Sequence, residues 1–340
     1  MARRTLSPAA LAVVRAASSA LSGRPTRVGV SGGADSMALA AALAHVAADH
    51  PVEALVVDHG LWDGSAEHSW RVAGEVARLG LVVRVVAVEV DARGAGVEAA
   101  ARDARHRALW LTPTASGRPV ERVWLAHSLD DQAESVLLGL ARGSGTRSLA
   151  GMAPRRREHR PGTPAGAEVV RPLLGLRRSV LREACSDWGI PVWDDPANAD
   201  PRFLRSAVRV EVMPALVATF GDAVVAALAR TASLARADAD ALDALAHDAG
   251  RAARDAGRLR VEALSGLPEA LRTRVVRAWL DSVGCPEVHH RHVLAVLLLV
   301  DDWHGQGPLH LPGGVRVERR HDMILATGGV RGVAASGPLG

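Results

Sequence analysis

The sequence contains no lysine and no tyrosine, so the 41 positions counted as lysine or arginine are all arginine. A chain without lysine has no Walker A loop, no Schiff-base lysine and no catalytic Ser-Lys pair. Because the formal net charge is only +4, any interaction with nucleic acid must depend on local arginine clusters rather than on the charge of the whole chain.

Cysteines and long apolar runs are also scarce. Cys185 and Cys285 are the only cysteines, and no C-x-x-C motif occurs. This argues against a disulfide framework or a zinc site and favours a reducing compartment. The apolar run 293–300 is far shorter than the roughly 18 residues of a membrane span, and no signal-peptide core follows Met1. We therefore expect a cytoplasmic protein without a membrane partner.

The length of 340 residues predicts two domains, and 48% apolar with 23% charged residues is typical of a globular protein. From residue 26 onward, short β-rich runs alternate with helical patterns, as in βαβ units. We predict a doubly wound α/β domain with a mostly parallel sheet over 1–215. A smaller, mostly helical domain with a terminal hairpin is predicted over 216–330, and a flexible tail over 331–340.

The expected elements follow from periodicity and capping signals. Strands are predicted over 27–30, 54–57, 81–90, 122–126 and 169–172. Helices are predicted over 36–48, 66–79, 97–111, 131–142, 177–188, 268–283 and 288–303, with one long helix or a helix pair over 222–256. Pro312-Gly313-Gly314 is predicted to form the turn of the closing hairpin, and the arginine-rich segment 154–167 a mobile basic loop.

Between the first predicted strand and the following helix lies Ser31-Gly32-Gly33-Ala34-Asp35-Ser36. Glycine-rich backbone amides and a helix N-terminus that converge on one point form an anion site for a pyrophosphate group. The two glycines let the backbone approach the phosphates, and the two serines offer hydroxyl donors. A carboxylate among phosphates needs a divalent cation between them, so Asp35 predicts magnesium.

This segment has three other interpretations, and the spacing excludes the third. The first is a tight turn in which Asp or Ser caps the helix and no ligand binds. The second is the nucleophile elbow of α/β-hydrolases, because Gly29-Val30-Ser31-Gly32-Gly33 fits G-x-S-x-G, although few residues precede it for the upstream strands of that fold. The third, a dinucleotide-binding loop, requires G-x-G-x-x-G, and this spacing does not fit.

Three further motifs lie at positions suited to a site. Val57-Asp58-His59-Gly60-Leu61 ends the second predicted strand at the carboxyl edge of the sheet, where open α/β sheets bind ligands. Glu98, Arg102 and Arg105 share one face of a helix, for which a surface ion-pair stripe is the alternative. The segment 127–134 places His127, Asp130, Asp131 and Glu134 at a strand end and a helix start, where helix capping is the alternative.

The segment 31–36 resembles the PP-loop of the N-type ATP pyrophosphatases, which split ATP between the α and β phosphates. With the other motifs, the chain is similar to the tRNA(Ile)-lysidine synthetases over about residues 27–215. The likeness continues through Gly151-Met152, Arg171-Pro172-Leu173-Leu174, Asp195-Pro196-Ala197-Asn198-Ala199-Asp200, Phe203, Arg205 and Arg209. Four residues depart from the family pattern: Trp62, His106, Ser128 and Ser206, where Arg, Tyr, His and Asn are usual.

The resemblance implies a C–N bond-forming ligase. ATP adenylates the C2 oxygen of the wobble cytidine in tRNA(Ile) with a CAU anticodon, and pyrophosphate leaves. The ε-amine of free L-lysine then attacks C2 and gives lysidine and AMP. The implied partners are therefore ATP with Mg²⁺, this tRNA and free lysine, and a homodimer is an assembly that the sequence allows.

The resemblance also implies residue roles. The nucleotide-binding residues are Ser31, Gly32, Gly33, Ala34, Asp35, Ser36, Asp58, Gly143 and Gly145. The catalytic residues are Asp35, Arg102, Arg105, His127, Asp131 and Glu134, of which Arg102, Arg105, Asp131 and Glu134 form the pocket for lysine and the activated cytidine. Magnesium is assigned to Asp35 and Asp130. The arginines of 155–160 with Arg202, Arg205 and Arg209 contact tRNA phosphates or are merely solvated.

Two other functions and one other site are open at this point. A tRNA-cytidine thiolase of the same superfamily would use paired cysteines, which this chain lacks. A paralogue that binds RNA without catalysis would show no ATP turnover dependent on tRNA. His289, His290 and His292 are spaced like metal ligands but also like solvated surface residues.

Overall fold

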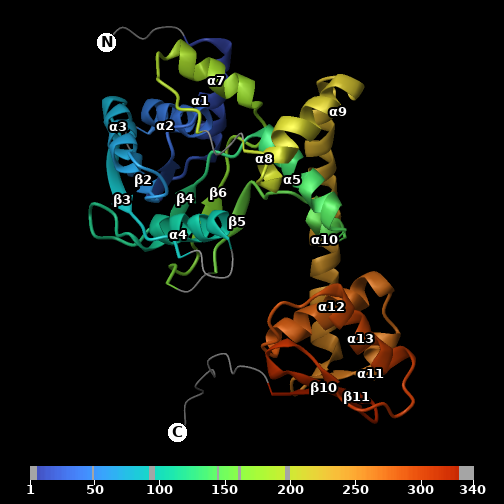
Figure 1. The fold of residues 1–340 in the computed structure, drawn as a ribbon. Helices are drawn as coiled ribbons and strands as arrows, with labels where there is room; N and C mark the ends of the chain where they lie inside the picture. Colours follow the sequence, from blue (N-terminus) through green and yellow to red (C-terminus); the bar gives the residue numbers. More distant parts are fainter. Residues whose placement is uncertain are drawn as a thin grey trace. The chain divides into compact units, whose positions relative to one another are not determined.

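The computed structural model describes residues 6–47, 50–91, 96–143, 145–159, 162–195 and 200–328. The chain divides into two compact units (Figure 1). The first comprises Met1–Gly143 and Ser148–Ser233, and the second comprises Ser144–Arg147 and Leu234–Gly340. The predicted tail over 331–340 lies outside the described residues.

The first unit is built on a six-stranded sheet with the strand order β3-β2-β1-β4-β6-β5. The strands are β1 Thr26–Val30, β2 Val52–Asp58, β3 Val82–Ala87, β4 Arg122–Trp124, β5 Arg155–Arg157 and β6 Glu168–Val170. All neighbouring strands are parallel except β5, which runs antiparallel to β6. This confirms the predicted doubly wound fold. The strand order reverses between β1 and β4, and such a switch point is where open α/β sheets bind ligands.

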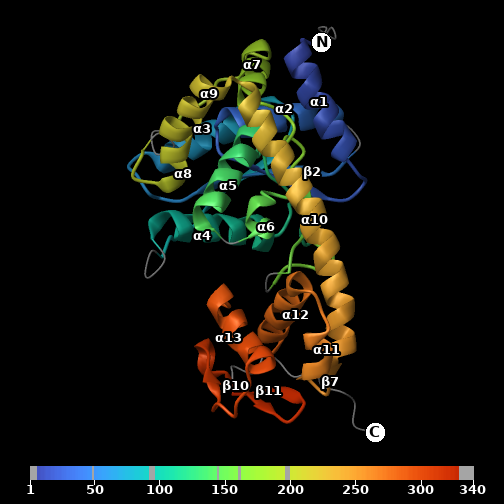
Figure 2. The same ribbon diagram turned by 90° about the vertical axis from the view of Figure 1, so that its right-hand side faces the viewer.

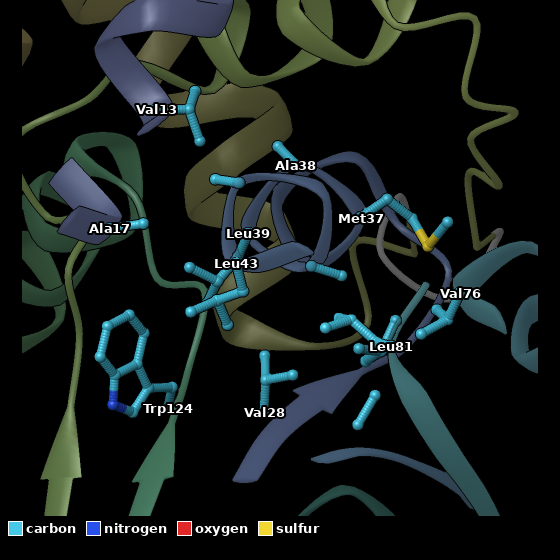
Figure 3. Close-up of a cluster of buried hydrophobic side chains, with 14 of the residues drawn as sticks. Val13, Ala17, Val28, Met37, Ala38, Leu39, Leu43, Val76, Leu81 and Trp124 are labelled. Atoms are coloured by element: carbon cyan, nitrogen blue, oxygen red, sulfur yellow. The ribbon is translucent and has the colours of Figure 1, made fainter. Parts of the chain in front are cut away.

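Helices cover both faces of this sheet (Figure 1). One face shares a core with α1 Pro8–Ala20, α2 Ala34–Val46, α3 Ser65–Arg78 and α7 Arg178–Asp187, and the other with α4 Val97–Leu111. The unit also contains α5 Leu129–Arg142, α8 Leu204–Ala207, a π-helical turn Val208–Val212 and α9 Met213–Phe220. Of these, α5, the turn and α9 share a separate small core. Ala54 and Val56 of β2 pack in a core with α1, α2 and α7, whereas Leu55 packs with Leu109 of α4. Figure 3 shows the first of these cores, where Leu39 and Leu43 of α2 lie over Val28.

The structure differs from the prediction in several elements of this unit. The helices α8 and α9 and the π-helical turn between them were not predicted. The helix α1 was missed, although Ser7 caps it and Pro8 occupies its first turn, which are local start signals. The mobile loop predicted over 154–167 is wrong at its start. There the backbone of Arg155–Arg157 pairs with β6 in register, and Glu158 N donates to Ala167 O at 2.8 Å. Residues 160 and 161 lie outside the described residues.

In the second unit, the helices α11 Val261–Ser265, α12 Glu269–Ser282 and α13 His290–Asp301 pack against an antiparallel sheet of order β7-β8-β11-β10-β9 (Figure 2). Its strands are β7 Arg254–Asp255, β8 Arg258–Arg260, β9 Leu309–His310, β10 Arg316–Arg320 and β11 Met323–Thr327. The predicted long helix is the single helix α10 Ala223–Ala253. Pro312–Gly314 does form the turn between β9 and β10, and a second hairpin, between β10 and β11, was not predicted.

Within the described part of the chain, no single helix combines the length and the apolar character needed to cross a membrane. One pair of helices, 204–220 and 223–253, reaches that length and composition only when taken together across a bend of 107°.

Candidate active site

The phosphate loop, residues 31–36, connects β1 to α2 and is closed by its own hydroxyl groups. Ser36 Oγ donates to Gly33 O at 2.9 Å and accepts from Ser31 N at 3.1 Å. Gly32 has a φ of +86°, and a Cβ placed there would lie 2.7 Å from a methyl carbon of Val72. Only glycine therefore fits at position 32, which leaves the backbone amides at the start of α2 free of side-chain cover.

Asp35 lies in the first turn of α2, and its two carboxylate oxygens differ. Oδ2 is 3.4 Å from Arg178 Nε, whereas Oδ1 is buried and accepts no hydrogen bond from the described residues. Burial raises the pKa of Asp35 to about 6, against the opposing charge of Arg178. A buried carboxylate oxygen without a partner beside an anion site fits a cation. The described residues contain no group of three or more acidic, His or Cys side chains around a metal position, so phosphate oxygens and water would complete the coordination.

A cluster of two carboxylates and three guanidinium groups lies next to Asp35. We call Asp131, Glu134, Arg178, Arg205 and Arg209 the carboxylate–arginine cluster. Each arginine contacts both carboxylates. The shortest pair in it is Arg209 Nε to Glu134 Oε1 at 2.8 Å. The cluster therefore joins helix α5 to α7, α8 and the π-helical turn.

Opposite charges in the cluster shift the pKa values of Asp131 and Arg178. Burial alone would raise the pKa of Asp131, but Arg178 and Arg205 outweigh it and lower the pKa to about 2. The same carboxylates, with Asp35, outweigh burial and raise the pKa of Arg178. The Glu134 side chain is only 1% exposed and lies beyond the first turn of α5, so the helix-capping alternative does not explain this residue.

The start of α5 fixes the position of Asp131. Ser128 is the N-cap, and its backbone N and its Oγ both donate to Asp131 Oδ2 at 2.8 Å. Asp131 N donates back to Ser128 Oγ at 3.4 Å, which completes a capping box. Serine at this departure from the family pattern therefore orients a carboxylate of the cluster. At another departure, His106 Nε2 lies 3.0 Å from Glu158 Oε2.

His127 and the arginines of α4 border the cluster. Burial lowers the pKa of His127 to about 3, so its imidazole is neutral at physiological pH, and its Nδ1 has no hydrogen-bond partner among the described residues. Desolvation, Arg102 and Arg205 lower the pKa of Arg105. The structure therefore brings Arg105 within electrostatic reach of the cluster, while the side chain of Glu98 lies outside what is described.

Two other predicted site residues, Asp58 and Asp130, accept hydrogen bonds from groups outside the cluster or from the backbone. Asp58 Oδ1, at the end of β2, accepts from Gly60 N at 3.0 Å. Asp130 Oδ2 accepts from the backbone N of Arg178 at 2.7 Å, and both of its oxygens lie 3.3 Å from Arg177 Nε. Asp130 therefore binds the start of α7, which carries Arg178 into the cluster.

The structure does not bring every predicted residue to the loop. Gly143 follows the last turn of α5, roughly 20 Å along a 14-residue helix from its N-cap. Gly145 belongs to the second unit, and Ser144 lies outside the described residues. His289 N donates to His292 Nδ1 at 3.1 Å, so these two histidines cap α13. Arg202, with a side chain 85% exposed, pairs with Asp200.

The sequence analysis missed Arg178, which contacts Asp35, Asp131 and Glu134. One signal for it existed. A guanidinium in the first turn of a helix is disfavoured by the helix dipole, so an arginine that begins α7 needs a compensating partner. The partner carboxylates are 44 and more positions away in the sequence, so no local pattern identifies them.

Comparison with known proteins agrees with this geometry. The profile of the PP-loop domain matches residues 11–216, and that of the TilS substrate binding domain matches residues 259–324. The fold and the loop thus define a PP-loop protein that uses ATP. Similar solved structures include that of a U34-tRNA thiolase, NcsA, from Methanococcus maripaludis with its [4Fe-4S] cluster. Its superposition on this chain has a TM-score of 0.50 at 15% sequence identity and covers 65% of this chain and 77% of that chain. That likeness shows a shared fold.

Relatives in sequence identify the family. The tRNA(Ile)-lysidine synthase of Salinispora tropica is 47% identical over 89% of this chain and 90% of that protein. The corresponding values are 46%, 88% and 84% for the Streptomyces coelicolor enzyme and 45%, 88% and 89% for that of Mycobacterium tuberculosis. The chain belongs to the tRNA(Ile)-lysidine synthase family.

Proposed function

We propose that this protein joins free lysine to the wobble cytidine of tRNA(Ile) with a CAU anticodon, in two steps driven by ATP. The observation that carries the proposal is Arg178, which links Asp35 of the phosphate loop to Asp131 and Glu134. This contact joins the carboxylate–arginine cluster to the phosphate loop, which in our proposal holds ATP while it is split. The first unit carries the catalysis, and the second unit, with its substrate binding domain, binds tRNA.

In the first step, the backbone amides at the start of α2 hold the phosphates of ATP, and Ser31 adds a hydroxyl donor. The Ser36 hydroxyl already donates to Gly33 O, so its part is to hold the shape of the loop. Asp35 holds the cation through Oδ1, the oxygen that accepts no hydrogen bond from the described residues. Magnesium, when bound, neutralises charge on the leaving pyrophosphate. Asp130 is less suited to this role because Arg177 and the backbone of Arg178 occupy its oxygens. Arg178 provides fixed positive charge where negative charge develops.

In the second step, the cluster receives the lysine amines. Each of the four carboxylate oxygens accepts at least two hydrogen bonds from serine or arginine, which fills its acceptor positions, so a lysine ammonium must displace a guanidinium. Arg209 is suited to move because it lies in a π-helical turn, a geometry frequent at functional sites. Arg102 and Arg105 of α4 bind the lysine carboxylate. With a pKa of about 2, Asp131 is a poor proton acceptor, so Glu134 is our candidate base.

The tRNA contacts outside the active site are assigned to exposed arginines. Arg155, Arg156 and Arg157 of β5 are exposed and contribute positive charge along an edge strand. Arg205 and Arg209 belong to the cluster, so we assign them to the reacting end of the tRNA rather than to its backbone. A cytoplasmic location and a homodimer stay predictions.

Nucleoside analysis tests the proposal directly. Unmodified tRNA(Ile) with a CAU anticodon is incubated with the enzyme, Mg²⁺, ATP and lysine, digested and examined by mass spectrometry. We expect lysidine, with one AMP released per modified tRNA. Without lysine, pyrophosphate should still be released in a single turnover, because adenylation precedes the attack. Absence of lysidine with wild-type protein would contradict the proposal.

A thiolase function is disfavoured by the surroundings of the cysteines. Cys185 and Cys285 are both buried. Burial raises the pKa of Cys185 to about 12, so its thiol is not the thiolate that sulfur transfer requires.

A further inference from the structure

Three rings gather beside the phosphate loop: Trp62 after β2, His68 in the first turn of α3 and Trp193 after α7. The Trp62 and Trp193 rings are stacked, with centroids 5.7 Å apart and planes inclined by 24°. The His68 ring centroid lies 4.0 Å from that of Trp193 and 5.9 Å from that of Trp62. We call this group the aromatic platform.

The aromatic platform contacts the loop that holds the phosphates. Trp193 N donates to Gly32 O at 3.0 Å. A Cβ at Gly32 would lie 3.2 Å from His68 Nε2, so the glycine lets the imidazole approach the loop. Asp35, three residues further on, contacts Arg178 of the carboxylate–arginine cluster. The loop is therefore bordered by stacked rings at Gly32 and by the cluster at Asp35.

Trp62 is the most exposed ring of the platform, whereas His68 and Trp193 are partly buried. Trp62 is 45% exposed, in a chain that has only 8 tryptophans, 2 phenylalanines and no tyrosine. Three other tryptophans, Trp110, Trp124 and Trp279, are buried in cores. In addition, His68 Nε2 is buried and has no hydrogen-bond partner within the described ranges. An indole that is nearly half exposed and lies near an unsatisfied polar atom suits a flat ligand that also carries hydrogen-bonding groups.

We propose that the exposed face of Trp62 stacks on a nucleobase and that His68 Nε2 forms a hydrogen bond with the same ligand. This inference rests on the proposed function, because both of its large substrates, ATP and tRNA, carry such bases. Aromatic stacking accepts any base, since every base has a π face. Trp62 stands where the family pattern has arginine, a side chain that also stacks on planar groups.

The alternative is that the three rings have only a structural role and stabilise the packing of the segment after α7 against the phosphate loop. That role predicts a loss of stability when Trp62 is changed, with no effect on a bound base. Trp62→Leu keeps apolar volume and removes the π face, and Trp62→Phe retains a ring. Trp70→Leu is the matched control, because Trp70 is 67% exposed on α3 and lies outside the described ring pairs.

The test uses 2-aminopurine, a base whose fluorescence is quenched by stacking, in two probes: 2-aminopurine riboside triphosphate, and tRNA(Ile) with the same base in its anticodon loop. We expect wild type and Trp70→Leu to quench one probe, and Trp62→Leu to lose that quenching and bind that probe at least 5-fold more weakly. Trp62→Phe should recover part of the quenching and part of the affinity for that probe. Quenching of the triphosphate probe identifies adenine as the base, and quenching of the tRNA probe identifies an RNA base.

Inorganic tripolyphosphate, which has no base, should bind equally well to wild type and Trp62→Leu. Equal quenching of both probes by wild type and Trp62→Leu would overturn the proposal, and so would the absence of quenching with wild type. The measurement needs no turnover. A wild-type protein that quenches a probe but forms no lysidine would refute the proposed function and leave the stacking site intact.

Discussion

Replacing Asp35 by asparagine should stabilise the fold at neutral pH and abolish pyrophosphate release. The Asp35 side chain is largely buried, with 21% of it exposed, and its pKa is raised from 3.8 to about 6. The folded state therefore holds the proton more tightly than the unfolded chain does. The contribution of this group to the free energy of unfolding is fully present below about pH 4. It is lost as the pH rises through the folded-state pKa of about 6. A shift of about two units corresponds to roughly 3 kcal/mol, which asparagine would recover above pH 6.

Urea unfolding between pH 4 and pH 8 measures this effect. The difference in the free energy of unfolding between Asp35→Asn and wild type should be close to zero at pH 4 and grow towards about 3 kcal/mol at pH 7. Glu67→Gln is the matched control, an exposed carboxylate in the first turn of α3, with an expected change within about 0.5 kcal/mol. Mg²⁺ with ATP should stabilise wild type more than the variant, because ligand binding to the folded state adds to stability.

The pH dependence separates this explanation from a simple structural defect. If Asp35→Asn is less stable than wild type at pH 7, or if the difference does not change between pH 4 and pH 7, then the buried charge is not the cause. If the variant releases pyrophosphate at nearly the wild-type rate, Asp35 does not hold the cation.

Three further predictions concern the cluster, the edge strand and the cap. Glu134→Gln removes the charge of a buried carboxylate that three partly buried arginines contact, and should cost about 3 kcal/mol in thermal or urea unfolding and raise the KM for lysine. Glu75→Gln, a surface pair with Arg78, should cost less than about 1 kcal/mol. Unaltered stability and lysine kinetics in Glu134→Gln would contradict its place in the cluster. Changing the three arginines of β5 to glutamine should reduce the salt dependence of tRNA binding by about one unit of slope per lost phosphate contact; an unchanged slope would make them solvated residues. Ser128→Ala should cost about 1 kcal/mol in urea unfolding through the lost capping box, and a change below a few tenths would exclude that role.

The sequence by itself determined the elements whose signals are local. Strand β1, the glycines of the phosphate loop and helix α2 follow one another within about 20 residues, and each has its own pattern of apolar periodicity, glycine and caps. The motif from His127 to Glu134 likewise indicated the start of α5. These features also carry the family resemblance, because the backbone needs particular residues there to approach phosphates and begin a helix.

Only the tertiary structure decided which side chains meet. Glu134 and Arg209 are 75 positions apart, and their contact requires α5 and the π-helical turn to pack together. The stacking of Trp62 on Trp193 likewise depends on the return of the chain after α7 to the phosphate loop. The sequence does not distinguish an arginine of the site from one on the surface, because both have the same side chain and charge. The position of a guanidinium at the end of a long side chain depends on how distant elements pack. For this reason the sequence indicated the phosphate loop and the acidic helix start, and folding selected Arg178, Arg205 and Arg209 as their partners.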